Sequence, residues 1–234
     1  MDARDLIAEA RRQRRAALDE IAAKQLLTAY GIAVPSSVIV PGAADAEAAF
    51  KQLKAPVAIK VMSPDILHKS DAGGVKVGIA SAKEASTAIQ EMMAVPAIGA
   101  ARVDGFVLEE MAPEGHEVVI GGLRDPHFGP LVMLGLGGIF VEVLADVTFR
   151  ICPIERRDAE EMLDEIKGAA ILKGARGRKP ASREAIVNAL LKIGGEDGLL
   201  MDLAADIQEA DINPLIVSET GAVAVDARFL LTKA

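Results

Sequence analysis

Residues Val57–Ile79 read VAIKVMSPDILHKSDAGGVKVGI, and this stretch decides how the first half of the chain folds. Its beginning, Val57–Met62, is apolar except for one lysine and predicts a buried strand. Its end, Val75–Ile79, alternates apolar residues with a lysine and a glycine, which predicts a second strand. A polar loop joins the two and closes with a pair of glycines. The stretch therefore predicts two strands that flank a loop, with a lysine on each strand.

The polar residues of this stretch suit an anionic, phosphate-bearing ligand. Lys60 and Lys76 supply compact positive charges, and Gly73 and Gly74 let backbone N–H groups approach phosphate oxygens closely. His68 is a candidate phosphoryl carrier, because an imidazole near neutral pH can act as a nucleophile. Each residue alone also has an ordinary explanation, a solvated lysine or a hairpin turn, and the P-loop pattern GxxxxGK[ST] is absent. The combination favours a nucleotide-phosphate clamp.

The composition indicates one large globular domain or two small ones. Of 234 residues, 51 % are hydrophobic but only 3 % are aromatic, so aliphatic side chains and alanine must fill the core. The 26 Lys and Arg residues against 34 Asp and Glu residues give a net charge of −8. This balance argues against a general nucleic-acid binder.

The chain carries no pattern of a targeting or membrane-spanning segment. The N-terminus is charged from Asp2 onward, unlike a signal peptide, and the apolar stretch 129–145 is interrupted by Pro130 and Glu142. The single cysteine, Cys152, lies in an apolar run and fits a core thiol in a reducing compartment. We therefore expect a cytoplasmic protein that does not bind membranes.

The order of predicted elements indicates two α+β lobes with a cleft between them. Residues 1–30 are helical in pattern. In the first lobe, helices capped by Asp45 and Ser81 alternate with four strands, at 37–40, 57–62, 75–79 and 105–111. This β-α-β-β-α-β order predicts one sheet with helices on one face. In the second lobe we expect helices that begin near Asp158 and at Ser182, and strands at 116–124, 130–135, 147–154, 207–217 and 222–231.

Two groups of acidic residues could serve a nucleotide. Glu109, Glu110 and Met111 end a strand between the lobes, and Glu117 follows, so their oxygens could accept hydrogen bonds from an adenine amino group or ribose hydroxyls. Glutamates at a loop entrance are, however, often merely solvated.

The second group lies near the C-terminus, in EADINP. Glu209, Asp211 and Asn213 alternate and so share one face of a strand, and a hairpin at 218–221 can return Asp226 to this face. Oxygen ligands from two adjacent strands suit Mg²⁺, which prefers a few protein oxygens together with phosphates and water. A polar stripe on an exposed sheet face is the equally weighted alternative.

Three segments together resemble the ATP-grasp subunit of the NDP-forming acyl-CoA synthetases, the superfamily that includes succinyl-CoA synthetase. They are the opening stretch, GFVLEEMAPEGHEVVIGGLRDPHFGPLVMLGLGGIFVE, and EADINPLIVSETGAVAVDARFLL. The chain is most similar to the separate β subunit of the ADP-forming acetyl-CoA (acyl-CoA) synthetases. The resemblance implies an ATP-grasp fold, with residues 21–112 as the N-terminal lobe, 113–234 as the C-terminal lobe, and 1–20 as a helix packed on the latter.

The resemblance also implies roles for individual residues. Lys60 would contact nucleotide phosphates, with Gly73, Gly74 and Lys76 beside it. Glu109, Glu110 and Met111 would line the adenine hinge, and Glu117 would bind the ribose. Asn213 and Asp226 match Mg²⁺ ligands. His68 matches a phosphohistidine that Asp211 would support.

The implied reaction is acid + CoA + ATP ⇌ acyl-CoA + ADP + phosphate, shared between two subunits. His68 would pass a phosphoryl group between ADP/ATP–Mg²⁺ here and a CoA-binding α subunit, in an α2β2 assembly, because no CoA-binding pattern occurs in this sequence. Two alternatives stay open. One is an ATP-grasp carboxylate ligase that forms an acyl phosphate directly, and the other is a nucleotide-sensing regulatory subunit.

Overall fold

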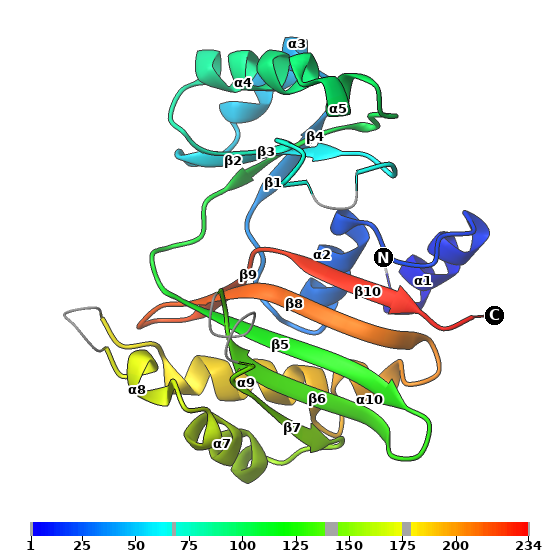
Figure 1. Ribbon diagram of the computed structural model, residues 1–234, viewed down its shortest axis with the longest axis vertical. Helices are drawn as coiled ribbons and strands as arrows, with labels where there is room; N and C mark the ends of the chain where they lie inside the picture. Colours follow the sequence, from blue (N-terminus) through cyan, green and yellow to red (C-terminus); the bar gives the residue numbers. More distant parts are fainter. Residues whose placement is uncertain (1, 67–68, 139–144, 175–178, 234) are drawn as a thin grey trace. The chain divides into compact units, whose positions relative to one another are not determined.

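The computed structural model describes residues 2–66, 69–138, 145–174 and 179–233 (Figure 1). The chain forms two compact units. The inserted unit is the continuous stretch Pro35–Ala112, and the discontinuous unit joins Met1–Val34 to Pro113–Ala234. Each unit has its own sheet and its own hydrophobic core.

The inserted unit is an antiparallel four-stranded sheet with helices on one face (Figure 1). Its elements are, in order, β1 (Ser37–Val40), α3 (Ala43–Phe50), β2 (Val57–Met62), β3 (Val75–Ile79), α4 (Ala82–Ala94), α5 (Pro96–Gly99) and β4 (Gly105–Glu110). The strand order β1-β4-β2-β3 confirms the predicted β-α-β-β-α-β unit. Ser81 caps α4 as expected, since its Oγ accepts a hydrogen bond from Glu84 N at 3.2 Å. Helix α3 begins earlier than expected, after Gly42.

Alternation along β2 and β4 separates two faces of this sheet. Val57, Ile59 and Val61 of β2 join Phe106 and Leu108 of β4 in the core beneath the helices. The residues between them therefore lie on the other face. They are Ala58, Lys60, Val107 and Glu109, and all four are buried.

The discontinuous unit is built on a six-stranded sheet in the order β10-β8-β5-β6-β7, with β9 also paired to β8. Its elements are α1 (Ala3–Arg12), α2 (Glu20–Ala29), β5 (His116–Asp125), β6 (Gly129–Leu136), β7 (Val147–Ile151), α7 (Arg156–Glu165), α8 (Ala169–Leu172), α9 (Arg183–Gly194), α10 (Leu199–Asp202), β8 (Ile207–Val217), β9 (Ala222–Ala224) and β10 (Ala227–Leu231). Helices α7, α9 and α10 cover one face of the sheet (Figure 1). Helix α9, whose start at Ser182 was predicted, buries an apolar stripe of Ile186, Ala189, Leu190 and Ile193.

The expectation of a continuous helical pattern over residues 1–30 is wrong. Two helices form, and the chain between them turns at Arg14, whose φ of 55° is left-handed. The segment after the turn binds the edge of β10, where Leu18 N donates to Phe229 O at 3.0 Å and Leu231 N donates to Ala16 O at 2.8 Å. Backbone hydrogen bonds to the sheet edge replace those that a continuous helix would make.

The predicted final strand, 222–231, is also interrupted. Val225 and Asp226 separate β9 from β10, and the two short strands pair with different parts of β8. The boundary between units also differs from the expected 21–112 lobe. Residues 21–34, which include most of α2, belong to the discontinuous unit, because Leu26 and Leu27 are fully buried in its core.

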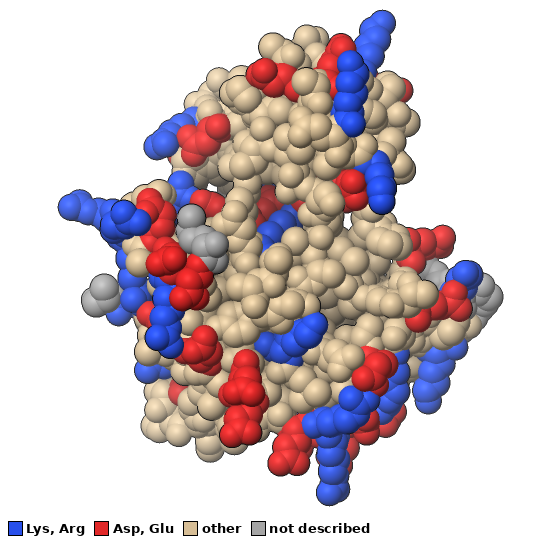
Figure 2. Space-filling model, turned by 180° about the vertical axis from the view of Figure 1, so that it is seen from behind, with Lys and Arg blue, Asp and Glu red and all other residues tan. Residues whose placement is uncertain are grey.

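Among the described residues, no helix combines the length and the apolar character needed to span a bilayer. Acidic and basic side chains are interspersed on the face seen in Figure 2, rather than gathered into one basic patch.

Candidate functional site

Lys60 and Glu109 form a buried ion pair on the helix-free face of the inserted unit. Lys60 Nζ lies 3.1 Å from Glu109 Oε1, and their side chains are 9 % and 1 % exposed. The register of β2 and β4 explains the contact, since Ala58 pairs with Glu109 and Lys60 pairs with Val107. The two charged residues are therefore diagonal neighbours on one face, within reach of long side chains.

Lys76 does not join this pair. It is opposite Ile59 in the β2–β3 register, whereas Lys60 is opposite Val75, so the two lysines point to opposite faces of the sheet. Lys76 Nζ instead makes an ion pair with Glu91 of α4. The structure thus separates the two cations that the sequence pattern placed in one phosphate clamp.

The glycine pair closes the loop by steric fit. Gly73 has a φ of +74°, and a Cβ on Gly74 would lie 2.5 Å from Val61 Cγ1. Both backbone N–H groups donate within the loop, Gly73 N to Ser70 O at 3.1 Å and Gly74 N to Lys69 O at 2.7 Å. In this conformation their N–H groups stabilise the turn, so close packing explains the glycines without a phosphate.

Glu110 and Met111 diverge from Glu109 at the end of β4. Glu110 is opposite Val57, on the helix-covered face, and its Oε1 accepts a hydrogen bond from Lys54 N at 2.9 Å. Met111 is exposed, and its N–H donates to Pro56 O at 3.2 Å. The two residues are therefore near the strand exit, where a hinge was expected, but Glu109 and Glu110 face opposite ways.

Glu117 lies exposed near the start of β5 and packs against a glycine. Its carbonyl accepts a hydrogen bond from Gly137 N at 2.8 Å, and a Cβ on Gly137 would lie 2.7 Å from Glu117 Cβ. Glycine is therefore required at 137 for close approach. Residues 139–144, which include the end of the segment GLGGIFVE (135–142), fall outside the described residues.

Glu209 and Asp211 of β8 lie close to Asp226, and their strand positions alternate with the buried Ala210 and Ile212. The pKa of Asp211 is raised, first by burial and then by the negative charges of Glu209 and Asp226, although Arg228 opposes the shift. Asp211 pairs in register with Arg228 on one side and with Gly121 on the other. This corner of the sheet holds more negative charge than its neighbours neutralise.

Asn213 and Asp226 are adjacent across the β8–β10 edge, as the hairpin predicted. Asn213 N donates to Asp226 O at 3.1 Å, and both side chains are exposed. Two oxygen donors beside a carboxylate of raised pKa fit a hard cation such as Mg²⁺. No set of three or more His, Cys, Asp or Glu residues within the described ranges is arranged to hold a metal ion. Such an ion would therefore draw further oxygens from phosphates and water.

His68, the predicted phosphoryl carrier, falls outside the described residues. The other two histidines have structural contacts: buried His116 Nε2 lies 2.7 Å from Lys179 O, and His127 N donates to Asp125 Oδ1 at 2.7 Å. Sequence reasoning missed one buried acid, Asp146, whose carboxylate accepts from the N–H groups of Lys167 and Gly168, both at 2.8 Å. No sequence pattern around this single aspartate indicated that its carboxylate would bind backbone N–H groups.

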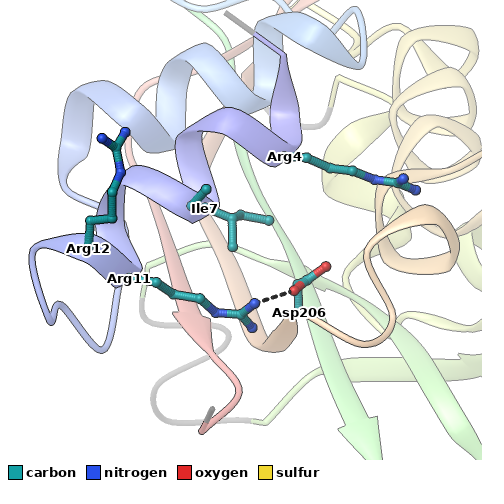
Figure 3. Close-up of a pocket in the computed structure, with 6 residues that line it drawn as sticks. Arg4, Ile7, Arg11, Arg12 and Asp206 are labelled. Atoms are coloured by element: carbon teal, nitrogen blue, oxygen red, sulfur yellow. Dashed lines mark ion pairs between the residues drawn. The ribbon is translucent and has the colours of Figure 1, made fainter.

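A pocket of about 580 Å³ lies beside α1, and no sequence pattern indicated it (Figure 3). Arg11 points towards Asp206, with Nη1 2.8 Å from Oδ1. The other two arginines also have acidic partners: Arg4 pairs with Asp202 at 3.1 Å, and Arg12 pairs with Glu9. Because each cation is already paired, the pocket does not favour an anionic ligand.

Comparison with known families assigns this fold. The ATP-grasp domain family matches residues 9–231, nearly the whole chain. The chain belongs to the ATP-grasp family. Its two α+β units confirm the predicted ATP-grasp fold class.

This ATP-grasp chain is similar to named ligase chains. It is 44 % identical over 231 residues to the beta subunit of acetate–CoA ligase [ADP-forming] I of Pyrococcus furiosus, covering 98 % of this chain and 97 % of that one. It is 41 % identical over 208 residues to acetate–CoA ligase [ADP-forming] I of Archaeoglobus fulgidus, where the match covers 88 % of this chain but 30 % of that protein.

A solved structure shows the same ATP-grasp architecture. It is acetyl-coenzyme A synthetase 1 of Ca. Korarchaeum cryptofilum, with a TM-score of 0.86 and 39 % identity over 99 % of this chain and 100 % of that chain. That protein is described in complex with coenzyme A and Mg-AMPPCP, with its phosphohistidine segment pointing towards the nucleotide binding site.

Proposed function

We propose that this chain is the nucleotide-binding β subunit of an ADP-forming acyl-CoA synthetase. The observation that carries the proposal is the 44 % identity to an ADP-forming acetate–CoA ligase beta subunit across nearly the full length of both chains. Its reaction is acid + CoA + ATP ⇌ acyl-CoA + ADP + phosphate. ATP or ADP with Mg²⁺ is the ligand, and the chain is an enzyme subunit rather than a complete ligase.

The phosphoryl step runs through His68. A ring nitrogen of His68 attacks the γ-phosphorus of ATP, the bond to the β–γ bridging oxygen breaks, and ADP leaves. In the opposite direction the terminal phosphate oxygen of ADP takes the group from the histidine. Lys60 neutralises charge on the phosphates, and Asp211 supports the histidine.

Asn213 and Asp226 would hold Mg²⁺. When bound, the ion would neutralise phosphate charge during transfer. Met111 and Glu117 would contact the nucleoside, with Gly73 and Gly74 near the phosphates. Glu110 and Lys76 face the helix-covered side of the inserted sheet, so this proposal gives them no contact with the nucleotide.

The partner is a CoA-binding α subunit, and we propose an α2β2 assembly. Support comes from the name beta subunit in the Pyrococcus relative and from the Archaeoglobus relative, of which this chain spans 30 %. The remaining part of such a longer protein supplies a natural counterpart of a separate partner chain. Acyl selectivity would then reside mainly in the partner.

Intact-mass measurement after incubation with Mg-ATP tests this function. The purified chain, alone and with its α partner, is compared with His68→Ala at neutral-to-alkaline pH. We expect one acid-labile phosphoryl group on the wild type and none on the variant, while calorimetry shows that the variant still binds Mg-ADP. Equal loss of nucleotide binding would overturn the carrier role. No phosphoryl gain, even with an active partner, would favour a direct carboxylate ligase or a nucleotide sensor.

A further inference from the structure

We infer that Glu109 acts on the nucleotide through Lys60, as the residue that positions the lysine, and not as a ligand of the adenine ring. The inference rests on the proposed nucleotide-binding function and assigns Glu109 a different role from its expected place in an adenine hinge. It concerns only contacts within the inserted unit.

Lys60 has apolar residues as its neighbours in the strand registers. Val107 on β4 and Val75 on β3 are directly opposite it in the two strand registers. Along its own strand, Ala58 and Met62 share its face. A buried ammonium group among such neighbours requires a counter-charge, and Glu109 supplies one at 3.1 Å.

The Glu109 side chain is more deeply buried than the Lys60 side chain that it contacts. The Glu109 side chain is 1 % exposed and the Lys60 side chain is 9 % exposed. Of the two side chains, Lys60 therefore leaves more surface open to a ligand on this face. Glu109 is also fixed in the middle of the β1–β4–β2 sheet, because its backbone pairs with Ser37 on one side and with Ala58 on the other.

Position at the strand exit does not by itself make a glutamate a nucleotide ligand. Glu110, the next residue, faces the other side of the sheet and binds the backbone of Lys54. Of the two glutamates, only Glu109 shares a face with Lys60. A charge-assisted contact of this kind restricts a flexible lysine to one direction, so that less entropy is lost when it meets a phosphate.

Comparing ADP with adenosine separates the two roles. Calorimetry on the whole chain would give the Kd of Mg-ADP and of adenosine for wild type and Glu109→Gln. Acting through Lys60, the substitution should raise the Kd of Mg-ADP about tenfold and leave that of adenosine within about twofold. An equal rise in the Kd of Mg-ADP and of adenosine would show that Glu109 binds the adenine and would overturn the inference. An unchanged Kd for Mg-ADP would overturn it as well.

A double-substitution cycle removes the dependence on how well Glu109→Gln folds. Lys60→Met leaves the buried Glu109 carboxylate without this partner, whereas Lys60→Met/Glu109→Gln leaves no charge at this pair. Their Kd values for Mg-ADP should agree within about twofold, because Glu109 has no lysine left to position. A further loss in the double variant would contradict the inference.

Glu84→Gln, a charge-matched change on α4 of the same unit, serves as the control and should bind Mg-ADP as the wild type does. If the wild type binds no Mg-ADP at all, the proposed function fails and not this inference.

Discussion

Gly74 marks a place where one added methyl group has no room. A Cβ there would lie 2.5 Å from Val61 Cγ1 and 3.0 Å from Lys69 O, and the latter is backbone that cannot rotate away. We therefore expect Gly74→Ala to lower the free energy of unfolding by about 1–3 kcal/mol, measured by urea unfolding. Gly221→Ala is the matched control, because nothing lies within 4 Å of its added Cβ. Equal stability of the two variants would contradict the steric argument.

Asp211 should make stability depend on pH in an unusual direction. Because its folded-state pKa is raised above the ordinary 3.8, the native protein binds a proton more readily than the unfolded chain between the two values. The ionised carboxylate therefore costs stability at neutral pH. Asp211→Asn should be more stable than wild type at pH 7, and this advantage should disappear as the pH falls from the raised pKa to below 3.8. Urea unfolding at several pH values would measure it.

Glu165 should make stability change with pH in the opposite direction to Asp211. Hydrogen bonds from Arg150 and Thr148 lower its pKa to about 2. The contribution of Glu165 to the stability of the folded protein is present above its ordinary pKa of 4.5 and is lost as the pH falls through about 2. Glu165→Gln should thus be less stable than wild type at pH 7 and equal to it at the acid end. If both variants showed the same pH trend, the electrostatic account of Asp211 would be wrong.

At single residues, the sequence predicted which side chains matter better than where they point. Lys60 and Lys76 looked like one clamp because both stand on strands beside the same loop. Their faces depend on the register across that loop and on the irregularity between Val57 and Ile59, which no local pattern reveals. Asn213 and Asp226 were predicted correctly as neighbours, since a short hairpin fixes its own register.

At the scale of elements, helix α1 allows the contributions of apolar packing and of an ion pair to protein stability to be compared directly. Its buried face consists of Ala3, Leu6, Ile7 and Ala10, whereas Arg4 forms an exposed ion pair with Asp202. Truncating a buried isoleucine costs about 2–5 kcal/mol, and an exposed ion pair contributes about 0–1 kcal/mol. We expect Ile7→Ala to destabilise the protein several times more than Arg4→Ala in urea unfolding. A comparable loss for Arg4→Ala, sensitive to salt, would show that the ion pair dominates.

Elements whose ends are set by local sequence signals were predicted well. A break that depends on contacts with a distant strand was not. Helices capped by Ser81 and Ser182 were predicted at the right residues, because a cap and an apolar stripe are properties of the segment itself. The break between α1 and α2 was missed. Helical periodicity continues across it, and the residues leave the helix only because the edge of β10 binds them.

At the scale of the whole molecule, family resemblance predicted the fold class and the junction after Ala112, but it did not predict to which unit residues 21–34 belong. An insertion such as Pro35–Ala112 returns the chain to the unit that it left, and the prolines at its two junctions, Pro35 and Pro113, do not show which outer segments pack together. Helix α2 was therefore grouped with the strands that follow it in sequence. Its buried Leu26 and Leu27 belong instead to the core of the discontinuous unit, which helix α1 and the elements after Pro113 complete.

That division predicts how fragments of the chain behave. A fragment of residues 113–234 lacks α1 and α2, whose Leu6, Ile7, Leu26 and Leu27 complete its core. It also loses two backbone hydrogen bonds to the N-terminal segment. Leu231 N donates to Ala16 O and Ala224 N donates to Ala33 O, both at 2.8 Å. We expect this fragment alone to give poorly dispersed NMR amide signals and no cooperative unfolding. Adding a peptide of residues 1–34 should restore both, because it returns the missing core in trans. A scrambled peptide of the same composition is the control, and cooperative folding of 113–234 on its own would refute the dependence on the N-terminal segment.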